Sequence, residues 1–447
     1  MDLDPVLLAR IQFAITIGFH FIFPPLSIGL AWLLVIIEGI GWRTGDPVYR
    51  NMGKLFGKLL AITFAVGVAT GVVMEFQFGT NWAEYSKFVG DIFGAPLAAE
   101  GVFAFFMESA FLGLYLFGRN KLSKGVHWFS IFMVALGATI SAFWILVANS
   151  WQQTPAGFII QNGRAELADF WAAVFNPSTA IRFFHTVDAA LISGAFMVMG
   201  VAAYLLIKNK GVDIAAKALK LALIFGFIVS VLELFPFGHE HAKQVAHTQP
   251  EKFAAIEGLY SSQTHAPLVL FGIVDATPPA GLKAEVNIPG LLSWMAFGSI
   301  DAHVQGLNEF PPDEVPPLWL TFVSFHNMVV LGMYFIGITA LGLFFLYRKK
   351  LLNMKWYLKL LIISIPLPVL ACQFGWVAAE VGRQPWVVYR VLKTIDAASV
   401  NVTAGEILFS IILFSLIYIF LFALYLFLSI REVNHVADSF TSKEVTS

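Results

Sequence analysis

The chain has 447 residues, of which 58% are hydrophobic and only 13% are charged, and its formal net charge is −1. A soluble domain usually has about a quarter of its residues charged, so this composition excludes a soluble enzyme, a disordered protein and a basic nucleic-acid-binding domain. The single cysteine, Cys372, excludes a disulfide framework and a multi-thiolate metal centre, so metal chemistry would depend on His, Met or carboxylate ligands.

Nine apolar segments are long enough to cross a membrane, since a transmembrane helix needs about 20 mostly apolar residues. They cover residues 7–36, 58–78, 96–117, 128–149, 181–207, 217–237, 318–347, 357–379 and 405–430. The first segment is too long for the core of a signal peptide and follows no basic stretch, so we expect it to be retained. The sequence therefore predicts an all-α, polytopic membrane protein.

Lys and Arg are concentrated in four loops, which the positive-inside rule places in the cytoplasm. These loops are 41–58, 118–127, 208–220 and 348–359. The N-terminus is then outside and the C-terminus inside. We expect three parts: helices one to six (1–238), an extracytoplasmic loop (239–317), and helices seven to nine with a cytoplasmic tail (318–447).

Along the chain, His20 is the first ionisable residue deep inside a predicted helix. It precedes Pro24 and Pro25, which remove backbone donors and should break or kink the helix. Its imidazole could bind a haem, relay protons, or pack as a hydrogen-bonded core residue. These three interpretations are equally compatible with the isolated pattern.

Glu100 and Glu108 lie eight residues apart on the third predicted helix, roughly 12 Å along its axis. Ionisable groups are costly inside a membrane, and such a pair of acids is typical of proton transfer. The alternative is a pair of carboxyl groups that neighbouring helices satisfy. By itself, the pair fits a proton-coupled transporter as well as a redox enzyme.

His185 and Met328 lie near the predicted outer ends of the fifth and seventh helices. A His and a thioether at matching depth could ligate one haem iron from both sides, although Met328 alone is more typical of core packing. Glu380 ends the eighth helix, with Arg383 following it. Such a pair is commonly a solvated ion pair, but it would also suit an iron ligand and haem propionates.

The four histidines between residues 239 and 265 have no recognised metal-ligand spacing, so we expect them to face solvent. A haem–copper oxidase would need about six His inside its helices, and a bis-His cytochrome b would need paired His on two helices. Neither pattern is present.

Several longer motifs occur in a fixed order along the chain. They are QFAITIGFH (12–20), VATGVVMEFQFGTNW (68–82), EG (100–101) with MES (107–109), WILVAN (144–149), RFFHT (182–186) and EVGRQPW (380–386). Together they resemble subunit I of cytochrome bd-type quinol oxidases, over about residues 8–430. The resemblance implies three haems near the outer face and a second membrane subunit, subunit II, and it leaves open small single-helix accessory subunits.

The resemblance also implies haem ligands. His185 and Met328 would ligate a low-spin haem b. His20 and Glu380 would ligate a high-spin haem b and a third haem, which is a haem d or a further haem b. Arg383 would neutralise haem propionates, and the cofactor-binding segment extends to Trp386.

The remaining implied roles concern protons and quinol. Glu100 and Glu108 would be the last steps of proton delivery, with Asn149 as a polar residue beside them. In the outer loop, Lys252 and Glu257 match a quinol-oxidising segment, where a carboxylate can accept a quinol proton and a lysine can steady the head group.

This sequence departs from better-known members of the family in two ways. His326 stands two residues before Met328, where those members have an Arg, so the corresponding propionate contact is not expected and the haem potential would be more sensitive to pH. The 239–317 loop also lacks a long insertion, which indicates the short-loop class.

The resulting prediction is a terminal respiratory oxidase in a bacterial cytoplasmic membrane. It would oxidise ubiquinol or menaquinol at the outer face and reduce O2 to water with cytoplasmic protons, building a proton motive force without pumping. A haem-containing quinol electron carrier and a proton-coupled transporter are the alternatives. The carrier would bind haem without consuming O2, and the transporter would be colourless.

Overall fold

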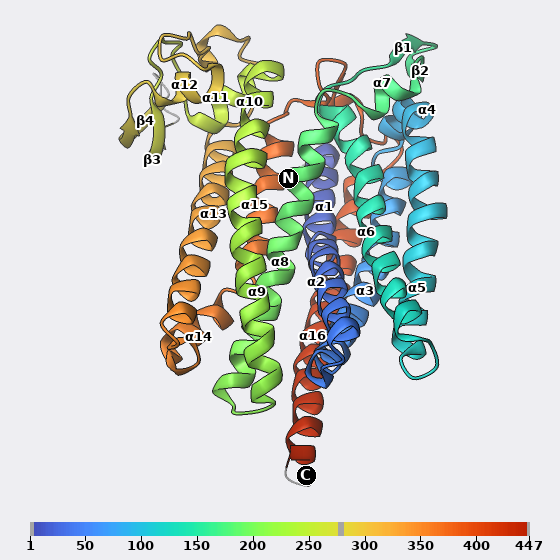
Figure 1. Ribbon diagram of the computed structural model, residues 1–447. Helices are drawn as coiled ribbons and strands as arrows, with labels where there is room; N and C mark the ends of the chain where they lie inside the picture. Colours follow the sequence, from blue (N-terminus) through green and yellow to red (C-terminus); the bar gives the residue numbers. More distant parts are fainter. Residues whose placement is uncertain (1–3, 276–280, 445–447) are drawn as a thin grey trace.

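The computed structural model describes residues 4–275 and 281–444, and it is a bundle of long, roughly parallel helices (Figure 1). Within these residues, nine helical segments are long and apolar enough to span a membrane. They are Pro5–Thr44, Pro47–Thr80, Ala83–Gly118, Lys124–Gln153, Thr179–Ile207, Val212–Thr248, Leu318–Tyr347, Lys355–Val381 and Ala404–Val436. Each contains one predicted segment, so the nine spans and the all-α class are confirmed.

The α-helices are α1 (Pro5–His20), α2 (Phe23–Thr44), α3 (Pro47–Thr80), α4 (Ala83–Ala99), α5 (Phe106–Gly118), α6 (Lys124–Gln153), α7 (Phe170–Val174), α8 (Thr179–Ile207), α9 (Val212–Leu232), α10 (His239–Thr248), α11 (Pro250–Glu257), α12 (Leu291–Phe297), α13 (Leu318–Tyr347), α14 (Lys355–Ile363), α15 (Leu367–Val381) and α16 (Ala404–Glu444). Two π-helices, η1 (Glu100–Phe105) and η2 (Glu233–Gly238), and three short 3₁₀ segments, η3 (Leu307–Glu309), η4 (Leu351–Asn353) and η5 (Thr394–Asp396), complete the helical elements.

Four membrane spans are interrupted where the sequence weakens the α-helical ladder. The eighth breaks between α14 and α15, where Pro366 precedes α15. Pro24 and Pro25 open α2, so the first span breaks after His20, as predicted. The third span passes through η1, and the sixth passes through η2, which contains Pro236. π-helical turns are rare and often mark functional sites. Both of these begin at a glutamate.

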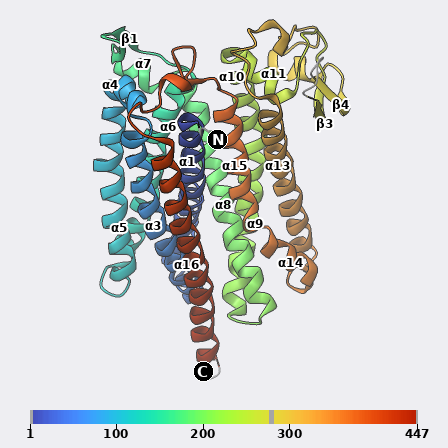
Figure 2. The same ribbon diagram turned by 180° about the vertical axis from the view of Figure 1, so that it is seen from behind.

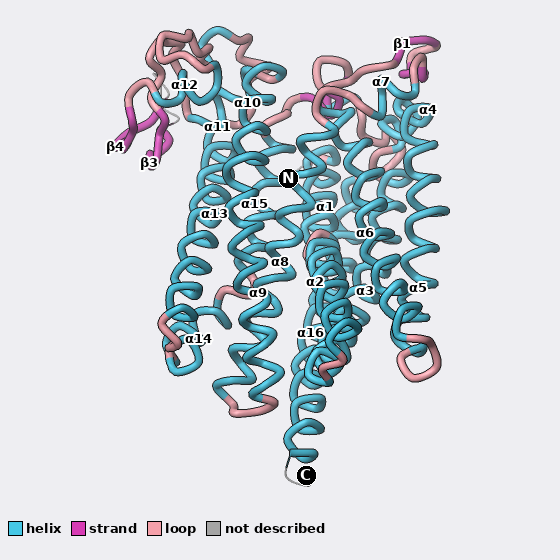
Figure 3. The backbone as a smooth tube through the Cα atoms, in the orientation of Figure 1, coloured by secondary structure: helices cyan, strands magenta, loops and turns pink. Residues whose placement is uncertain are grey.

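Strands occur only as short hairpins at one end of the described part of the bundle (Figure 3). β1 (Phe158–Gln161) pairs with β2 (Arg164–Leu167) through Asn162 and Gly163, whose positive φ angles of 53° and 74° suit a tight hairpin turn. β3 (Leu268–Asp275) pairs with β4 (Gly281–Ile288), and β5 (Trp386–Val388) pairs with β6 (Leu392–Lys393).

The elements α10, α11, α12 and the β3–β4 hairpin lie over one side of this end, and α7 with β1–β2 lies over the other (Figures 1 and 2). The C-terminal end of α16 lies at the opposite end of the bundle (Figure 2). The sixth span continues through α10 to Thr248, so the first ten residues of the predicted 239–317 loop extend that helix.

Helices α2 and α8 approach each other closely where they cross. A Cβ on Gly29 would lie 2.2 Å from the carbonyl oxygen of Ala190, and a Cβ on Gly194 would lie 2.2 Å from the Gly29 backbone. Small residues let membrane helices approach this closely. Leu30, Leu33 and other fully buried side chains of the same core surround the crossing. This contact fixes α8, whose first turns contain His185.

Candidate functional site

Side chains from four elements meet at the end of the bundle that bears the hairpins. Asn149 lies in the last turn of α6, Arg182 in the first turn of α8, Glu380 in the last turn of α15, and Lys252 in α11. The sequence separates them by up to 231 residues. Only the packing of α6, α8 and α15 brings them together.

Glu380 is held by a connected set of hydrogen bonds. Asn149 Nδ2 donates to Glu380 Oε1 at 3.0 Å, and the Arg383 guanidinium pairs with Glu380 Oε2. The Arg182 guanidinium in turn donates to Asn149 Oδ1. Asn149 is therefore bound to Glu380 and Arg182. Ser141, which contacts Glu100, lies eight residues earlier on α6, roughly 12 Å along its axis.

The charges of this site do not balance. Arg182 and Arg383 are 7% and 4% exposed, and the buried Lys252 lies near both of them and near Glu380. Arg182 Nε and Trp386 Nε1 are buried donors without a hydrogen-bond partner. Buried donors and charges are usually paired, so this arrangement suits an anionic substituent of a cofactor. The predicted haem propionates fit it.

The surroundings of His20 favour one tautomer of its ring. The Thr70 hydroxyl donates to the carbonyl oxygens of Val66 and Gly67, each 3.0 Å away, so its oxygen can accept a proton from His20 Nδ1 at 3.0 Å. This leaves Nε2 as the nitrogen with a free lone pair, the form that ligates iron. A Cβ on Gly71 would lie 3.2 Å from the ring, so the glycine makes room for the imidazole.

His185 lies against two residues of the sixth span. Its Nδ1 is 3.0 Å from Glu233 Oε1, and its ring centroid is 5.0 Å from that of His241. His241 is therefore packed inside the protein, and the expectation that it faces solvent is wrong, whereas His247 and His265 are exposed as predicted. The sequence analysis missed Glu233. Its signal was present, because Glu233 is an acid inside a predicted membrane span.

Met328, on α13, packs against α15 at a glycine. A Cβ on Gly375 would lie 2.7 Å from the Met328 sulfur, so only a glycine there leaves the thioether this position. His326, on the same helix, has its two ring nitrogens 3.0 and 3.1 Å from the carbonyl oxygens of Phe322 and Val269. His326 thus ties strand β3 to α13.

The two predicted proton-path acids lie on either side of η1. Glu100 begins η1 and accepts a hydrogen bond from the Ser141 hydroxyl at 2.7 Å. Glu108 is buried in the first turn of α5, where a Cβ on Gly137 would lie 3.2 Å from its Cβ. The wider π-helical turn between them rotates one acid relative to the other, compared with a regular α-helix. The Glu100 carboxyl group thus contacts Ser141 of α6, and the backbone and Cβ of Glu108 pack against Gly137 of the same helix.

Lys252 and Glu257 are both on α11 and both 4% exposed. Lys252 Nζ donates to Gln153 Oε1 and to the carbonyl oxygen of Ala379, each at 2.9 Å. Burial, followed by the nearby Arg182 and Arg383 charges, lowers the pKa of Lys252 well below its ordinary value. Lys252 thereby links α11 to the residue immediately before Glu380.

Burial raises the pKa of Glu257 to about 8, and its Oε2 has no hydrogen-bond partner. Such a carboxyl group is neutral at neutral pH and is suited to proton exchange.

Glu251, which immediately precedes Lys252 on α11, was not singled out from the sequence. It accepts a hydrogen bond from the Tyr389 hydroxyl at 2.7 Å. Glu251 thus docks α11 onto the segment that follows α15, while Lys252 docks it onto α6 and α15.

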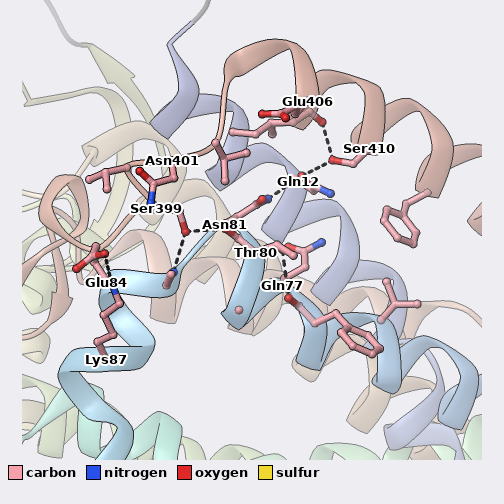
Figure 4. Close-up of a pocket in the computed structure, with 18 residues that line it drawn as sticks. Gln12, Gln77, Thr80, Asn81, Glu84, Lys87, Ser399, Asn401, Glu406 and Ser410 are labelled. Carbon is pink, nitrogen blue, oxygen red and sulfur yellow. Dashed lines mark hydrogen bonds and ion pairs between the residues drawn. The ribbon is translucent and has the colours of Figure 1, made fainter.

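A separate pocket of about 510 Å³ lies between α1, α3, α4 and α16 (Figure 4). Gln12 is central to its polar wall, where its Oε1 accepts hydrogen bonds from Asn81 at 2.7 Å and Ser410 at 3.0 Å. None of the site residues predicted from the sequence lines it. The pocket is thus distinct from the cluster around Glu380.

The chain matches a known family over nearly its whole length. The model of the family described as "Cytochrome bd terminal oxidase subunit I" matches residues 8–437. The chain is 43% identical to "Cytochrome bd ubiquinol oxidase subunit 1" of Bacillus subtilis (strain 168), over 98% of this chain and 95% of that protein. It is 36% identical to "Cytochrome bd-II ubiquinol oxidase subunit 1" of Escherichia coli (strain K12), over 92% of each.

A solved structure is also similar. The fold matches a chain of "The structure of bd oxidase from Geobacillus thermodenitrificans" with a TM-score of 0.91 and 33% sequence identity. The match covers 97% of this chain and 99% of that chain. The similarity therefore includes the outer elements as well as the bundle.

Proposed function

Because the chain belongs to the cytochrome bd terminal oxidase subunit I family, and is a multi-pass subunit of a membrane quinol oxidase, we propose that its outer end oxidises quinol and its core serves O2 reduction. Family membership implies haem cofactors, quinol and O2 as substrates, and a partner subunit II. Small accessory subunits are a further proposal, to be sought among the proteins that copurify.

We assign the iron ligands as follows. His185 and Met328 hold a low-spin haem b, and His20 and Glu380 hold a high-spin haem b and a third haem of type d or b. The Thr70 contact of His20, the glycine beside Met328 and the unpaired donors around Glu380 support this assignment. When bound, haem supplies one-electron transfer and the reduction of O2.

At the outer end, Glu257 accepts a proton from a quinol hydroxyl while Lys252 steadies the head group. The support for this role is a buried carboxyl group with a pKa near 8 and an unpartnered oxygen. Lys252 lies between Gln153 and the Ala379 carbonyl, at the end of the helix that bears Glu380. Electrons thus enter on the side where Arg182 and the Glu380–Arg383 pair lie.

Protons for water formation come from the other side. In our proposal, Glu108 and then Glu100 pass them outward along α5 and η1, with Ser141 holding Glu100. In the same proposal the N-terminus is outside and the C-terminus is in the cytoplasm of a bacterial inner membrane, which the distribution of basic residues among the loops supports. Proton release outside and proton uptake inside then separate charge without a pump.

The observation that carries this proposal is the buried excess of positive charge around Glu380, adjoining the helix that bears Lys252 and Glu257. The test is a reduced-minus-oxidised spectrum of the purified complex with pyridine haemochromogen quantitation. Three haems per chain are expected, and a far-red chlorin band would identify the third as haem d, whereas its absence would identify an all-b oxidase. A colourless intact complex would refute the assignment, and haem without quinol-dependent O2 uptake would indicate an electron carrier.

A further inference from the structure

The π-helix η2 places an acid beside a proposed iron ligand. Glu233 is the first residue of η2, where the sixth span departs from α-helical geometry ahead of Pro236. A Cβ on Gly238, at the other end of η2, would lie 3.9 Å from the His185 ring. The wide turn thus wraps around His185, and Glu233 is nearly buried, with 14% of its side chain exposed.

The polar atoms in this contact are poorly satisfied. His185 Nδ1 lies 3.0 Å from Glu233 Oε1, but neither Nδ1 nor Glu233 Oε2 forms a hydrogen bond in the present geometry. Asp188, one turn after His185, interacts directly with Glu233, and its Oδ2 is also a buried atom without a partner. Buried polar atoms without partners are rare in proteins and call for an explanation.

His241 does not supply that explanation. Its ring meets the His185 ring edge to face, with an angle of 67° between the ring planes, which is a packing geometry. The nearest charged group to His185 Nδ1 that the contacts identify is the Glu233 carboxyl. A small rotation of the imidazole would align Nδ1–H on Oε1, since the two atoms are already at hydrogen-bond distance.

We propose that Glu233 is a positioning residue for the low-spin haem: it accepts the Nδ1–H of His185, so that Nε2 faces the iron, and Asp188 holds Glu233 in place. This inference rests on the proposed function in taking His185 as an iron ligand. A ligating His almost always donates its other ring N–H to a carboxylate, carbonyl or water, which fixes the ring and makes it a stronger donor to the metal.

The proposed hydrogen bond from His185 to Glu233 should shift the reduction equilibrium of the haem in one direction. As a carboxylate, the Glu233 acceptor on Nδ1 makes the imidazole more electron-donating and so favours the ferric haem. Replacing it with the weaker amide acceptor in Glu233→Gln should favour the ferrous haem. Loss of such a partner typically costs about 10- to 100-fold in metal affinity or activity, and we expect a change of at least the lower size in the reduction equilibrium. A tenfold change in the reduction equilibrium corresponds to about 59 mV for one electron.

The experiment compares Glu233→Gln with wild type in the complete, purified oxidase. Low-spin haem content and midpoint potential are read from the reduced spectrum during a redox titration. We expect normal haem content and a midpoint potential raised by at least the equivalent of a tenfold shift. Glu233→Asp should restore most of the wild-type value. Glu240→Gln, which changes an exposed acid on α10 paired with Lys243, is the matched control and should leave the potential unchanged.

An unchanged potential in Glu233→Gln would overturn the inference. If that variant does not assemble, Asp188→Ala decides, because it removes the side chain that interacts with Glu233 and should shift the potential in the same direction by a smaller amount. His185→Ala separates this inference from the proposed function. If it keeps a normal low-spin haem, His185 is not a ligand and both fail. If it loses that haem while Glu233→Gln keeps the wild-type potential, only the role of Glu233 fails.

Discussion

Glu257→Gln is the sharpest test of the quinol-oxidising end. Glu257 is the last residue of α11 and is 4% exposed. With a pKa of about 8, roughly a tenth of it is ionised at pH 7, since each pH unit is a factor of ten. The neutral acid and the amide have nearly the same shape, so the substitution should leave the fold and the haem spectrum intact while it removes the proposed proton acceptor.

The effect of Glu257 on the pH dependence of stability can be calculated from its raised pKa. The change from 4.5 to about 8 corresponds to about 5 kcal/mol against an ionised Glu257 in the folded state, at about 1.4 kcal/mol per unit. The folded state therefore binds this proton more tightly than the unfolded state. The contribution of Glu257 to the free energy of unfolding is constant below about pH 4.5. It falls by about 1.4 kcal/mol per pH unit between about pH 4.5 and pH 8, and it is constant again above pH 8. Glu257→Gln should abolish this loss.

The assay is quinol-dependent O2 uptake as a function of pH, with local stability of α11 followed by amide hydrogen exchange. The wild-type rate should rise about tenfold per pH unit towards pH 8, if the ionised form is the base. The variant should be slower by about 10²- to 10⁴-fold and should lose this inflection. Glu240→Gln, at an exposed position on α10, should behave as wild type. A fully active Glu257→Gln with the same pH profile would refute the reasoning.

Four further outcomes are expected. Met328→Leu should convert the low-spin haem to high-spin and lower its potential, and an unchanged low-spin spectrum would remove Met328 from the ligands. Glu108→Gln should slow proton uptake after an O2 pulse by about 10²-fold without loss of haem, as measured with a pH indicator. Lys252→Met removes the proposed contact with the quinol head group, so the KM for quinol should rise, and a wild-type KM would contradict this role. The substitution also leaves the buried Gln153 and Ala379 acceptors unpaired, at about 1–3 kcal/mol each. Gly194→Ala overpacks the α2–α8 crossing by about 1–3 kcal/mol and should lower the thermal midpoint of the complex, unlike Gly90→Ala, where a Cβ meets no atom within 4 Å.

The membrane spans could be predicted because apolar length alone identifies a helix that must satisfy its backbone inside lipid. The ends of the spans could not. The sixth helix continues to Thr248 through His239, Glu240 and Lys243, whose polarity ends the hydropathy signal while the backbone stays helical. The break after His20 was predictable because proline acts locally.

The candidate site was predictable only residue by residue. The Glu380–Arg383 pair is local in sequence and could be anticipated from its spacing. Lys252 reaches Gln153 and Ala379, which are 99 and 127 residues away, and Glu251 reaches Tyr389 over 138 residues. No local pattern encodes such contacts. Glu233 could have been noted as an acid inside a predicted span, but its contact with His185 could not, since it depends on how η2 wraps around α8.

The most direct test of the central claim is the membrane potential of proteoliposomes that contain the complete oxidase and respire on quinol. Oxidation at the outer end, with proton uptake through Glu108 and Glu100 from the other side, predicts an uncoupler-sensitive potential. It also predicts acidification of the compartment that faces α11. Full O2 uptake without any potential would contradict this account, because quinol protons and water-forming protons would then exchange with the same side.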